Sequence, residues 1–222
     1  MNYWYLIILC FLLMAIFIYF EKNEKYKLAV LFKGLASLMF VVLGILCGIQ
    51  NIDMEFSKLV KYGLILGLIA DILLNLRFVF KQKGKIVFLV GILVFLAGHI
   101  LYLCALLPKC RNLLVSIIVA VILTVVILLW IFSKIEAQKA FKIFGVFYIG
   151  TIVFMNCVAM SNLISDYSIA NLVFVIGAIS FLISDIVLIL NTFGKETKFS
   201  LRVTNLSLYY LGQILIAISL SL

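Results

Sequence analysis

The strongest constraint on this chain is a series of long apolar stretches that fills most of its 222 residues. Each has roughly the 17 to 25 residues that an α-helix needs to cross the hydrocarbon core of a bilayer. The stretches cover residues 3–20, 28–49, 59–78, 86–107, 113–132, 140–160, 169–191 and 203–222. We therefore predict an all-α fold, a polytopic membrane bundle of eight transmembrane helices.

The composition agrees with this prediction. Hydrophobic residues make up 67% of the chain, charged residues 12%, and there is a single proline, which is far from the composition of a soluble globular protein. The first stretch has no basic region before it and no small-residue cleavage site after it, so we expect a retained helix. The connections are short, and we expect residues 1–222 to form a single integral membrane domain.

The net charge of +9 is distributed as a topology signal. Thirteen lysines and arginines lie after the first, third, fifth and seventh stretches, at their ends or in the connections that follow. The alternate connections hold only Lys58, Lys61, Lys109 and Arg111. The positive-inside rule then predicts that both termini are non-cytoplasmic, and we expect a location in the cell membrane and no nucleic-acid partner.

The cysteines give no sign of a metal or disulfide framework. The five are odd in number, scattered, and without a CxxC pair. The chain has one histidine, which excludes a three-histidine zinc site. We expect no metal and no other cofactor, although two aspartates and His99 could in principle hold one ion.

Two apolar stretches each contain an aspartate in nearly the same context. LIADILLNL at residues 68–76 contains Asp71, and LISDIVLIL at residues 182–190 contains Asp185. An ionisable group at membrane depth costs a few kcal/mol on insertion scales, so a functional site is the default hypothesis. The aspartates are 114 residues apart, and His99 and Gln213 each follow one of them by 28 residues. This spacing indicates a possible parallel 4+4 internal repeat, with chance as the alternative, and predicts that both carboxyl groups lie at similar depth and face one cavity.

Six of the eight stretches carry polar or small residues at helical spacing, so we expect them to surround a shared polar interior. The first and fifth stretches lack such a stripe and are predicted to lie at the periphery. The stripes are Lys33 and Ser37; Gly63, Gly67, Asp71 and Asn75; Phe95, His99 and Tyr102; Tyr148, Met155 and Asn156; Gly177, Phe181, Ser184 and Asp185; and Asn205, Tyr209, Gln213 and Ala217.

Several of these residues allow two interpretations. Lys33 can reach back to the lipid headgroups, or point inward at a phosphate or an aspartate. His99 can make an ordinary interhelical hydrogen bond or take part in proton transfer. Tyr148 can donate a hydrogen bond to a headgroup or belong to the interfacial aromatic belt.

A pair of buried carboxyl groups permits acid catalysis. Desolvation and a neighbouring carboxylate both disfavour the ionised form, so such a pair can hold one proton near neutral pH. One carboxyl group can then protonate a reacting atom while the other stabilises positive charge or orients water. The sequence contains no GxSxG elbow, Walker loop or HExxH motif.

At these residues the sequence resembles the YhhN-like family, the lysoplasmalogenases. The matching pieces are Lys33 with Ser37, IADILL around Asp71, GHILY at 98–102, GAISFLISD at 177–185 and LYYLGQILIA at 208–217. Gly34 and Ala70 depart from the family pattern, which usually has proline at the first position and glycine or serine at the second.

The resemblance implies an integral membrane hydrolase that cleaves the vinyl ether bond of lysoplasmalogens to a fatty aldehyde and a glycerophospho-alcohol. Its partners would be a lysophospholipid substrate and membrane lipid. The catalytic residues would be Asp71, Asp185 and His99. The substrate-binding residues would be Lys33, Ser37, Tyr102, Tyr148, Asn156, Ser184, Tyr209, Tyr210 and Gln213, with Lys33 and Tyr148 at the phosphate.

Two other classes remain open. Intramembrane acids and parallel repeats also occur in transporters and proton-coupled carriers. A non-catalytic lipid-binding membrane protein could use Lys33 and an aspartate as a structural ion pair.

Overall fold

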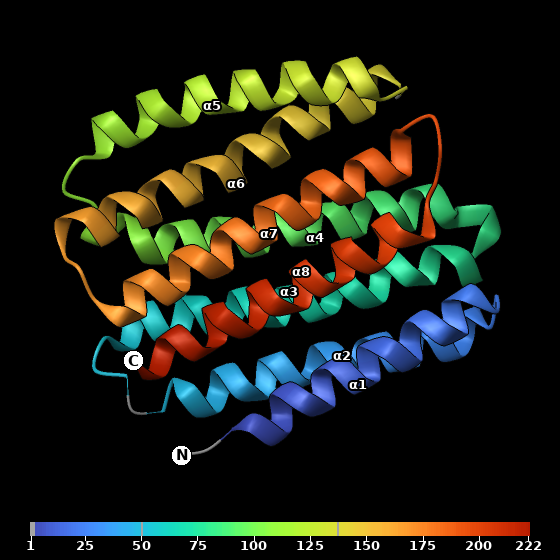
Figure 1. Ribbon diagram of the computed structural model, residues 1–222, viewed down its shortest axis with the longest axis horizontal. Coiled ribbons are helices and arrows are strands. Elements are labelled where there is room, and N and C mark those ends of the chain that lie inside the picture. The colour runs from blue at the N-terminus through green and yellow to red at the C-terminus, as the bar shows by residue number, and fades with distance from the viewer. Residues whose placement is uncertain (1–2, 50, 137) are drawn as a thin grey trace.

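The computed structural model describes residues 3–49, 51–136 and 138–222, and for Lys139 and Ala140 it describes the backbone alone. Within these residues, eight helices are long and apolar enough to cross a membrane, which confirms the predicted all-α membrane fold (Figure 1). They are α1 (Trp4–Lys22), α2 (Tyr26–Cys47), α3 (Met54–Val79), α4 (Gly84–Leu106), α5 (Leu113–Lys134), α6 (Lys139–Ser165), α7 (Ile169–Phe193) and α8 (Phe199–Ile218). Short 3₁₀ turns follow α3, α4 and α8: η1 (Lys81–Lys83), η2 (Leu107–Lys109) and η3 (Ser219–Ser221).

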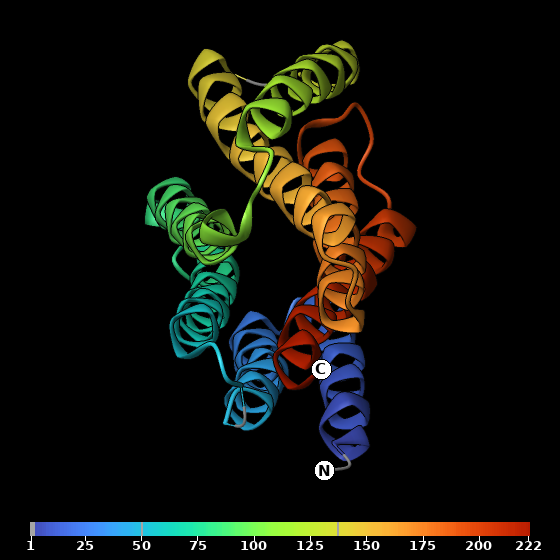
Figure 2. The ribbon, with the colours of Figure 1, turned by 90° about the vertical axis from the view of Figure 1, so that its left-hand side faces the viewer.

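Six of the helices form a ring. Around it, α2 contacts α3, α3 contacts α4, α4 contacts α6, α6 contacts α7, α7 contacts α8, and α8 contacts α2 (Figure 2). Helix α1 packs outside the ring against α2 and α8, and α5 packs outside it against α6 and α7. These two helices share the lowest burial of the eight, 22% of each span, so the peripheral positions predicted for them are confirmed.

Local sequence sets where two of the ring helices begin. Asp53 caps α3, because its carboxylate accepts a hydrogen bond from the Phe56 N–H at 3.0 Å. That hydrogen bond, together with the Lys109 ammonium at 3.0 Å, holds the pKa of Asp53 below its usual range. Ser168 caps α7 in the same way, accepting a hydrogen bond from the Asn171 N–H at 3.1 Å.

Glycines bring two pairs of helices into close contact. A Cβ atom on Gly98 of α4 would lie 3.2 Å from the Gly63 carbonyl of α3. A Cβ atom on Gly212 of α8 would lie 2.8 Å from the Gly177 carbonyl of α7. The two pairs are separated by the same 114 residues as the two aspartates. This agrees with a 4+4 repeat, although the repeat and the non-cytoplasmic placement of the termini, which lie at one end of the bundle, stay predictions (Figure 1).

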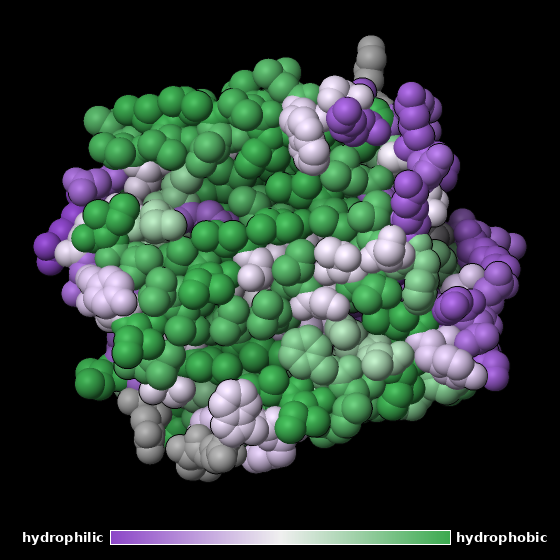
Figure 3. Space-filling model, viewed as in Figure 1, coloured by the Kyte–Doolittle hydropathy of each residue, from purple (hydrophilic) through white to green (hydrophobic). Residues whose placement is uncertain are grey.

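The surface has a broad apolar band between two polar ends (Figure 3). One of these, here called the basic end, is formed by the connections α1–α2, α3–α4, α5–α6 and α7–α8. Helix α5 contributes large exposed side chains to the band, including Leu114, Val121 and Leu129. An apolar surface of this extent is stable in lipid and not in water, so the chain is an integral, multi-pass membrane protein.

Candidate functional site

Asp71 on α3 lies at the centre of a buried polar network. Its Oδ1 pairs with the Lys33 ammonium of α2 at 3.0 Å, and both side chains are at most 4% exposed. Its Oδ2 accepts hydrogen bonds from the hydroxyls of Ser37 and Tyr209, each at 2.6 Å. A buried ion pair persists only when such additional donors satisfy the carboxylate. Lys33 therefore points inward and does not extend to the headgroups.

Three further residues extend this network towards the other helices. Gln213 donates to the Tyr209 hydroxyl at 3.4 Å and accepts from Tyr102 at 2.9 Å. The Tyr210 hydroxyl lies 3.2 Å from Ser37 Oγ. Either oxygen can be the donor in that contact, and the Tyr210 hydroxyl also donates to the Lys33 carbonyl at 3.4 Å. A chain of hydroxyl and amide groups thus leads to the Asp71 carboxylate from two sides.

Asp185 on α7 has fewer polar partners than Asp71. Its Oδ2 accepts a hydrogen bond from the Tyr148 hydroxyl of α6 at 2.7 Å, and no cation of the described residues pairs with it. The adjacent Ser184 bonds instead to Asn205 of α8: its hydroxyl donates to the Asn205 carbonyl at 3.0 Å. The two aspartates, alike in sequence, therefore sit in opposite electrostatic environments.

Asp71 and Asp185 both line one cavity in the half of the bundle towards the basic end. The cavity encloses about 1120 Å³ of space free of protein atoms, part of it open to the surroundings. Its polar lining comes mainly from α2, α3 and α8, and α4, α5, α6 and α7 supply its apolar walls, which include Phe88, Ile131 and Phe144. A lining that is polar on one side and apolar on the others suits an amphiphilic molecule with one polar end.

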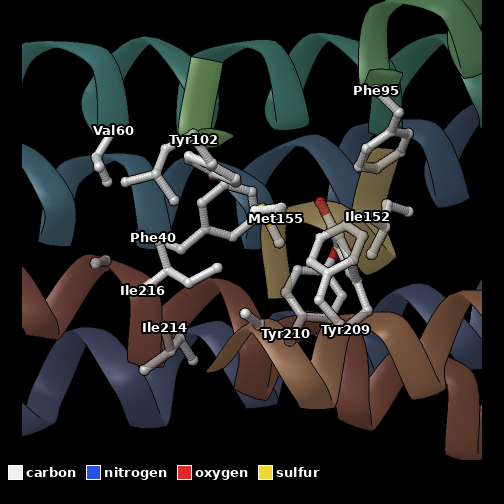
Figure 4. Close-up of a cluster of buried hydrophobic side chains, with 14 of the residues drawn as sticks. Phe40, Val60, Phe95, Tyr102, Ile152, Met155, Tyr209, Tyr210, Ile214 and Ile216 are labelled. Carbon is white, nitrogen blue, oxygen red and sulfur yellow. The ribbon is translucent and has the colours of Figure 1, made fainter. Parts of the chain in front are cut away.

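Tyr209 forms part of the aromatic floor of this cavity. Its ring lies 5.7 Å from Phe95 of α4, 5.3 Å from Phe181 and 5.0 Å from Tyr210, measured between centroids. Figure 4 shows Tyr209 and Tyr210 side by side on α8 with Phe95 and Ile152 nearby. Their packing holds the phenol of Tyr209 against Asp71.

Five of the predicted site residues line the cavity: Lys33, Asp71, Tyr148, Asp185 and Tyr209. The others lie behind its wall: Ser37, His99, Tyr102, Asn156, Ser184, Tyr210 and Gln213. The roles predicted for both groups stay predictions.

His99 is turned back onto its own helix. Its Nδ1 lies 2.8 Å from the Phe95 carbonyl, which accepts the proton of the neutral ring. Its Nε2 is buried without a hydrogen-bond partner among the described residues, and the ring packs 4.5 Å from the ring of Phe181. A second buried orphan is the Oδ1 of Asn156, whose amide nitrogen donates to the Ile152 carbonyl at 2.9 Å. The side-chain hydrogen bonds of His99 and Asn156 thus stay within their own helices.

Two arginines of the cavity lining were missed by the sequence reasoning, which counted them as topology charges. Arg202 of α8 makes two hydrogen bonds to Glu21 of α1, at 2.7 and 2.9 Å. Arg77 of α3 lies over the rings of Phe78 and Phe88. One sequence feature could have identified Arg77 as a site residue: it lies inside the third apolar stretch, six residues after Asp71.

Eight helices of spanning length among the described residues, and a cavity with two buried carboxyl groups between them, define a polytopic membrane protein with an intramembrane polar site. Within that class, the model of the YhhN family matches residues 28–220. The chain belongs to the YhhN family, and the resemblance carried by its motifs is confirmed. Comparison with curated proteins and with solved structures gave no match.

Proposed function

We propose that this protein is a hydrolase of the cell membrane that cleaves the vinyl ether bond of lysoplasmalogens, releasing a fatty aldehyde and a glycerophospho-alcohol. Membership in the YhhN family supports a hydrolase-type membrane enzyme. The observation that carries the proposal is the pair of carboxyl groups on one cavity, of which only Asp71 has a cationic partner.

The reaction needs an acid and an anion in one place. A proton adds to the β-carbon of the vinyl ether, which leaves an oxocarbenium ion. Water adds to the cationic carbon and loses a proton, giving a hemiacetal. The hemiacetal collapses: its hydroxyl proton is transferred to the glycerol oxygen as the carbon–oxygen bond breaks, so aldehyde and alcohol are formed. No redox step occurs, and one water molecule is consumed.

The different surroundings of the two carboxyl groups support different roles for them in this scheme. Asp71 has an ammonium at 3.0 Å and two hydroxyl donors at 2.6 Å, all of which stabilise its ionised form. It is therefore the carboxylate that stabilises the oxocarbenium ion. Asp185 has a single phenol donor and no cationic partner among the described residues, so it is the group that holds the proton.

Tyr148 positions that proton. Its hydroxyl donates to Oδ2 of Asp185 at 2.7 Å, which leaves Oδ1 to carry the acidic hydrogen. After the transfer, the ionised Asp185 can take a proton from the attacking water and return to its starting state. Tyr148 and Asp185 would thus act as one acid–base unit.

The test is aldehyde release from lysoplasmenyl-ethanolamine by the purified protein in detergent. Asp185→Asn should lower kcat by roughly 10²- to 10⁴-fold, the range for loss of a general acid. Asp71→Asn should lower kcat by roughly 10²- to 10³-fold, the range for loss of an electrostatic stabiliser. Asp53→Asn is the matched control, because it makes the same change at the exposed cap of α3. Undiminished release by both Asp71 and Asp185 variants would disprove the catalytic assignment.

One observation favours a second candidate, a non-catalytic lipid-binding protein. The Lys33–Asp71 ion pair is buried and could serve stability alone. In that case Asp71→Asn would lower the unfolding temperature, and neither wild type nor variants would release aldehyde. The carrier alternative gains less support, since α3 and α7 run without a break through Asp71 and Asp185.

A further inference from the structure

Three cationic side chains of the described residues line the cavity, and they differ in their partners. Lys33 is neutralised by Asp71 at 3.0 Å, and Arg202 by Glu21 at 2.7 Å. Arg77 has no carboxylate or hydrogen-bond partner among the described residues, and its Nε atom is buried. It is the one cation of this lining that has no carboxylate within ion-pair distance among the described residues.

Aromatic rings hold the Arg77 guanidinium at the cavity wall. Its central carbon lies 4.6 Å from the ring centroid of Phe78 and 4.4 Å from that of Phe88. Phe88 in turn contacts Phe141 of α6 and Phe193 of α7, at 6.3 and 6.4 Å between centroids. The three phenylalanines, from three helices, form an aromatic cluster beside the guanidinium, near the basic end. The rings supply no hydrogen-bond acceptor of ordinary strength, so the N–H groups of the two terminal nitrogens are left for a ligand.

A partly buried cation without a counter-charge is costly unless a ligand supplies the negative charge. The planar fork of five N–H donors fits the oxygens of a phosphate group in a bidentate contact. We infer that Arg77 binds the phosphate of the lysophospholipid substrate at the mouth of the cavity. This inference rests on the function proposed above and adds to it a residue that selects phosphate-bearing substrates.

The spacing along α3 agrees with this placement. Arg77 follows Asp71 by six residues, which corresponds to a rise of about 9 Å along the helix axis. In the substrate, five single bonds of about 1.5 Å separate phosphorus from the ether oxygen, a span of about 6 Å when extended. The hydrogen-bond distance between the guanidinium and the phosphate accounts for the rest of the rise along α3. A phosphate on Arg77 would therefore bring the vinyl ether to the level of Asp71 and Asp185.

This assignment replaces the phosphate role expected for Lys33 and Tyr148. The ammonium of Lys33 is already bound by Asp71 and Asn75, at 3.0 and 3.4 Å, and the hydroxyl of Tyr148 donates to Asp185. A phosphate beside them would also be repelled by the Asp71 carboxylate. Arg77 has no hydrogen-bond partner among the described residues and forms no ion pair with Asp71.

The experiment compares two substrates that differ only in the phosphate headgroup: 1-alkenyl-glycero-3-phosphoethanolamine and 1-alkenylglycerol. Arg77→Gln should raise KM for the first by roughly 10- to 100-fold, the size of a charge-assisted hydrogen-bond contact, with little change in kcat. It should leave KM for the second unchanged. Arg77→Lys should recover part of the loss, because it keeps the charge without the fork. Lys85→Gln, an exposed charge at the same end of the bundle, is the matched control and should alter neither substrate.

Equal effects of Arg77→Gln on both substrates, or no effect on either, would overturn the inference. Loss of the folded protein is recognised by its unfolding temperature, and Arg77→Lys then carries the comparison. If the wild type releases aldehyde from neither substrate, the proposed function fails, but the phosphate site can still be measured. In that case binding of radiolabelled 1-alkyl-glycero-3-phosphoethanolamine, which lacks the vinyl bond, should weaken in the Arg77 variants and not in Lys85→Gln. Equal binding by all of them would refute the site itself.

Discussion

Replacing Lys33 by methionine tests how the buried charges are balanced. The two side chains are 4% and 2% exposed and their charged atoms are 3.0 Å apart. Methionine matches the length of the lysine stem, so the change removes the ammonium with little loss of packing. Removing one partner of such a pair leaves the other charge buried, at a cost of about 3–5 kcal/mol. The Ser37 and Tyr209 hydroxyls still solvate the carboxylate, which places the expected loss near the lower end of that range.

The decisive measurement is a double-mutant cycle. Lys33→Met, Asp71→Asn and the double variant would be unfolded by denaturant in the same detergent and their free energies of unfolding compared. Because the double variant leaves no uncompensated charge, it should be more stable than Lys33→Met alone. If Lys33→Met is as stable as the wild type, or if the two single losses simply add, the ion pair contributes nothing and the assignment of Asp71 as the anion loses its basis.

Four other substitutions, at three positions, have expected outcomes. Asp53→Ala should remove a pH-dependent part of the free energy of unfolding, because the pKa of Asp53 is lower in the folded chain than in the unfolded chain. In the wild type, the stabilisation by Asp53 is fully present above about pH 3.9 and is lost as the pH falls through the pKa of the folded state. Unfolding temperatures of wild type and variant, measured across the acid range, would detect the difference. Gly145→Ala should stabilise α6 by up to about 1 kcal/mol, since its Cβ would meet nothing within 4 Å, whereas Gly145→Trp should fill the cavity and abolish lysolipid binding while the protein stays folded. Gly212→Ala should instead destabilise the protein by about 1–3 kcal/mol in the same unfolding assay, because its Cβ would lie 2.8 Å from a backbone oxygen of α7.

Helical periodicity was sufficient to predict the spans and the inward faces. The stripe around Asp71 identified the inward face of α3. Gly63, Asp71 and Asn75 all lie on that face and are buried. The equivalent stripe did so for Asp185 on α7. These are properties of one helix, which the order of its residues determines directly.

Contacts between side chains on different helices could not be predicted from helical periodicity. A stripe shows that Lys33 faces inward, but not that its ammonium pairs with Asp71. The distinction between Arg202 and Arg77 depends on Glu21, which lies 181 residues before Arg202 in the chain. His99 was correctly placed in the interior, yet its ring bonds to its own helix, which is a matter of side-chain rotation.

The interval of 114 residues allows the surroundings of Asp71 and Asp185 to be compared position by position. Counted at that interval, the position that matches Lys33 of α2 is Phe147 of α6, an exposed side chain without charge. One aspartate thus lies beside an ammonium and the other accepts a hydrogen bond from a phenol alone. In a perfectly twofold assembly of identical halves, both carboxyl groups would favour the same protonation state. The difference between α2 and α6 at these positions leaves the cavity with one ion-paired carboxyl group and one that has no cationic partner among the described residues.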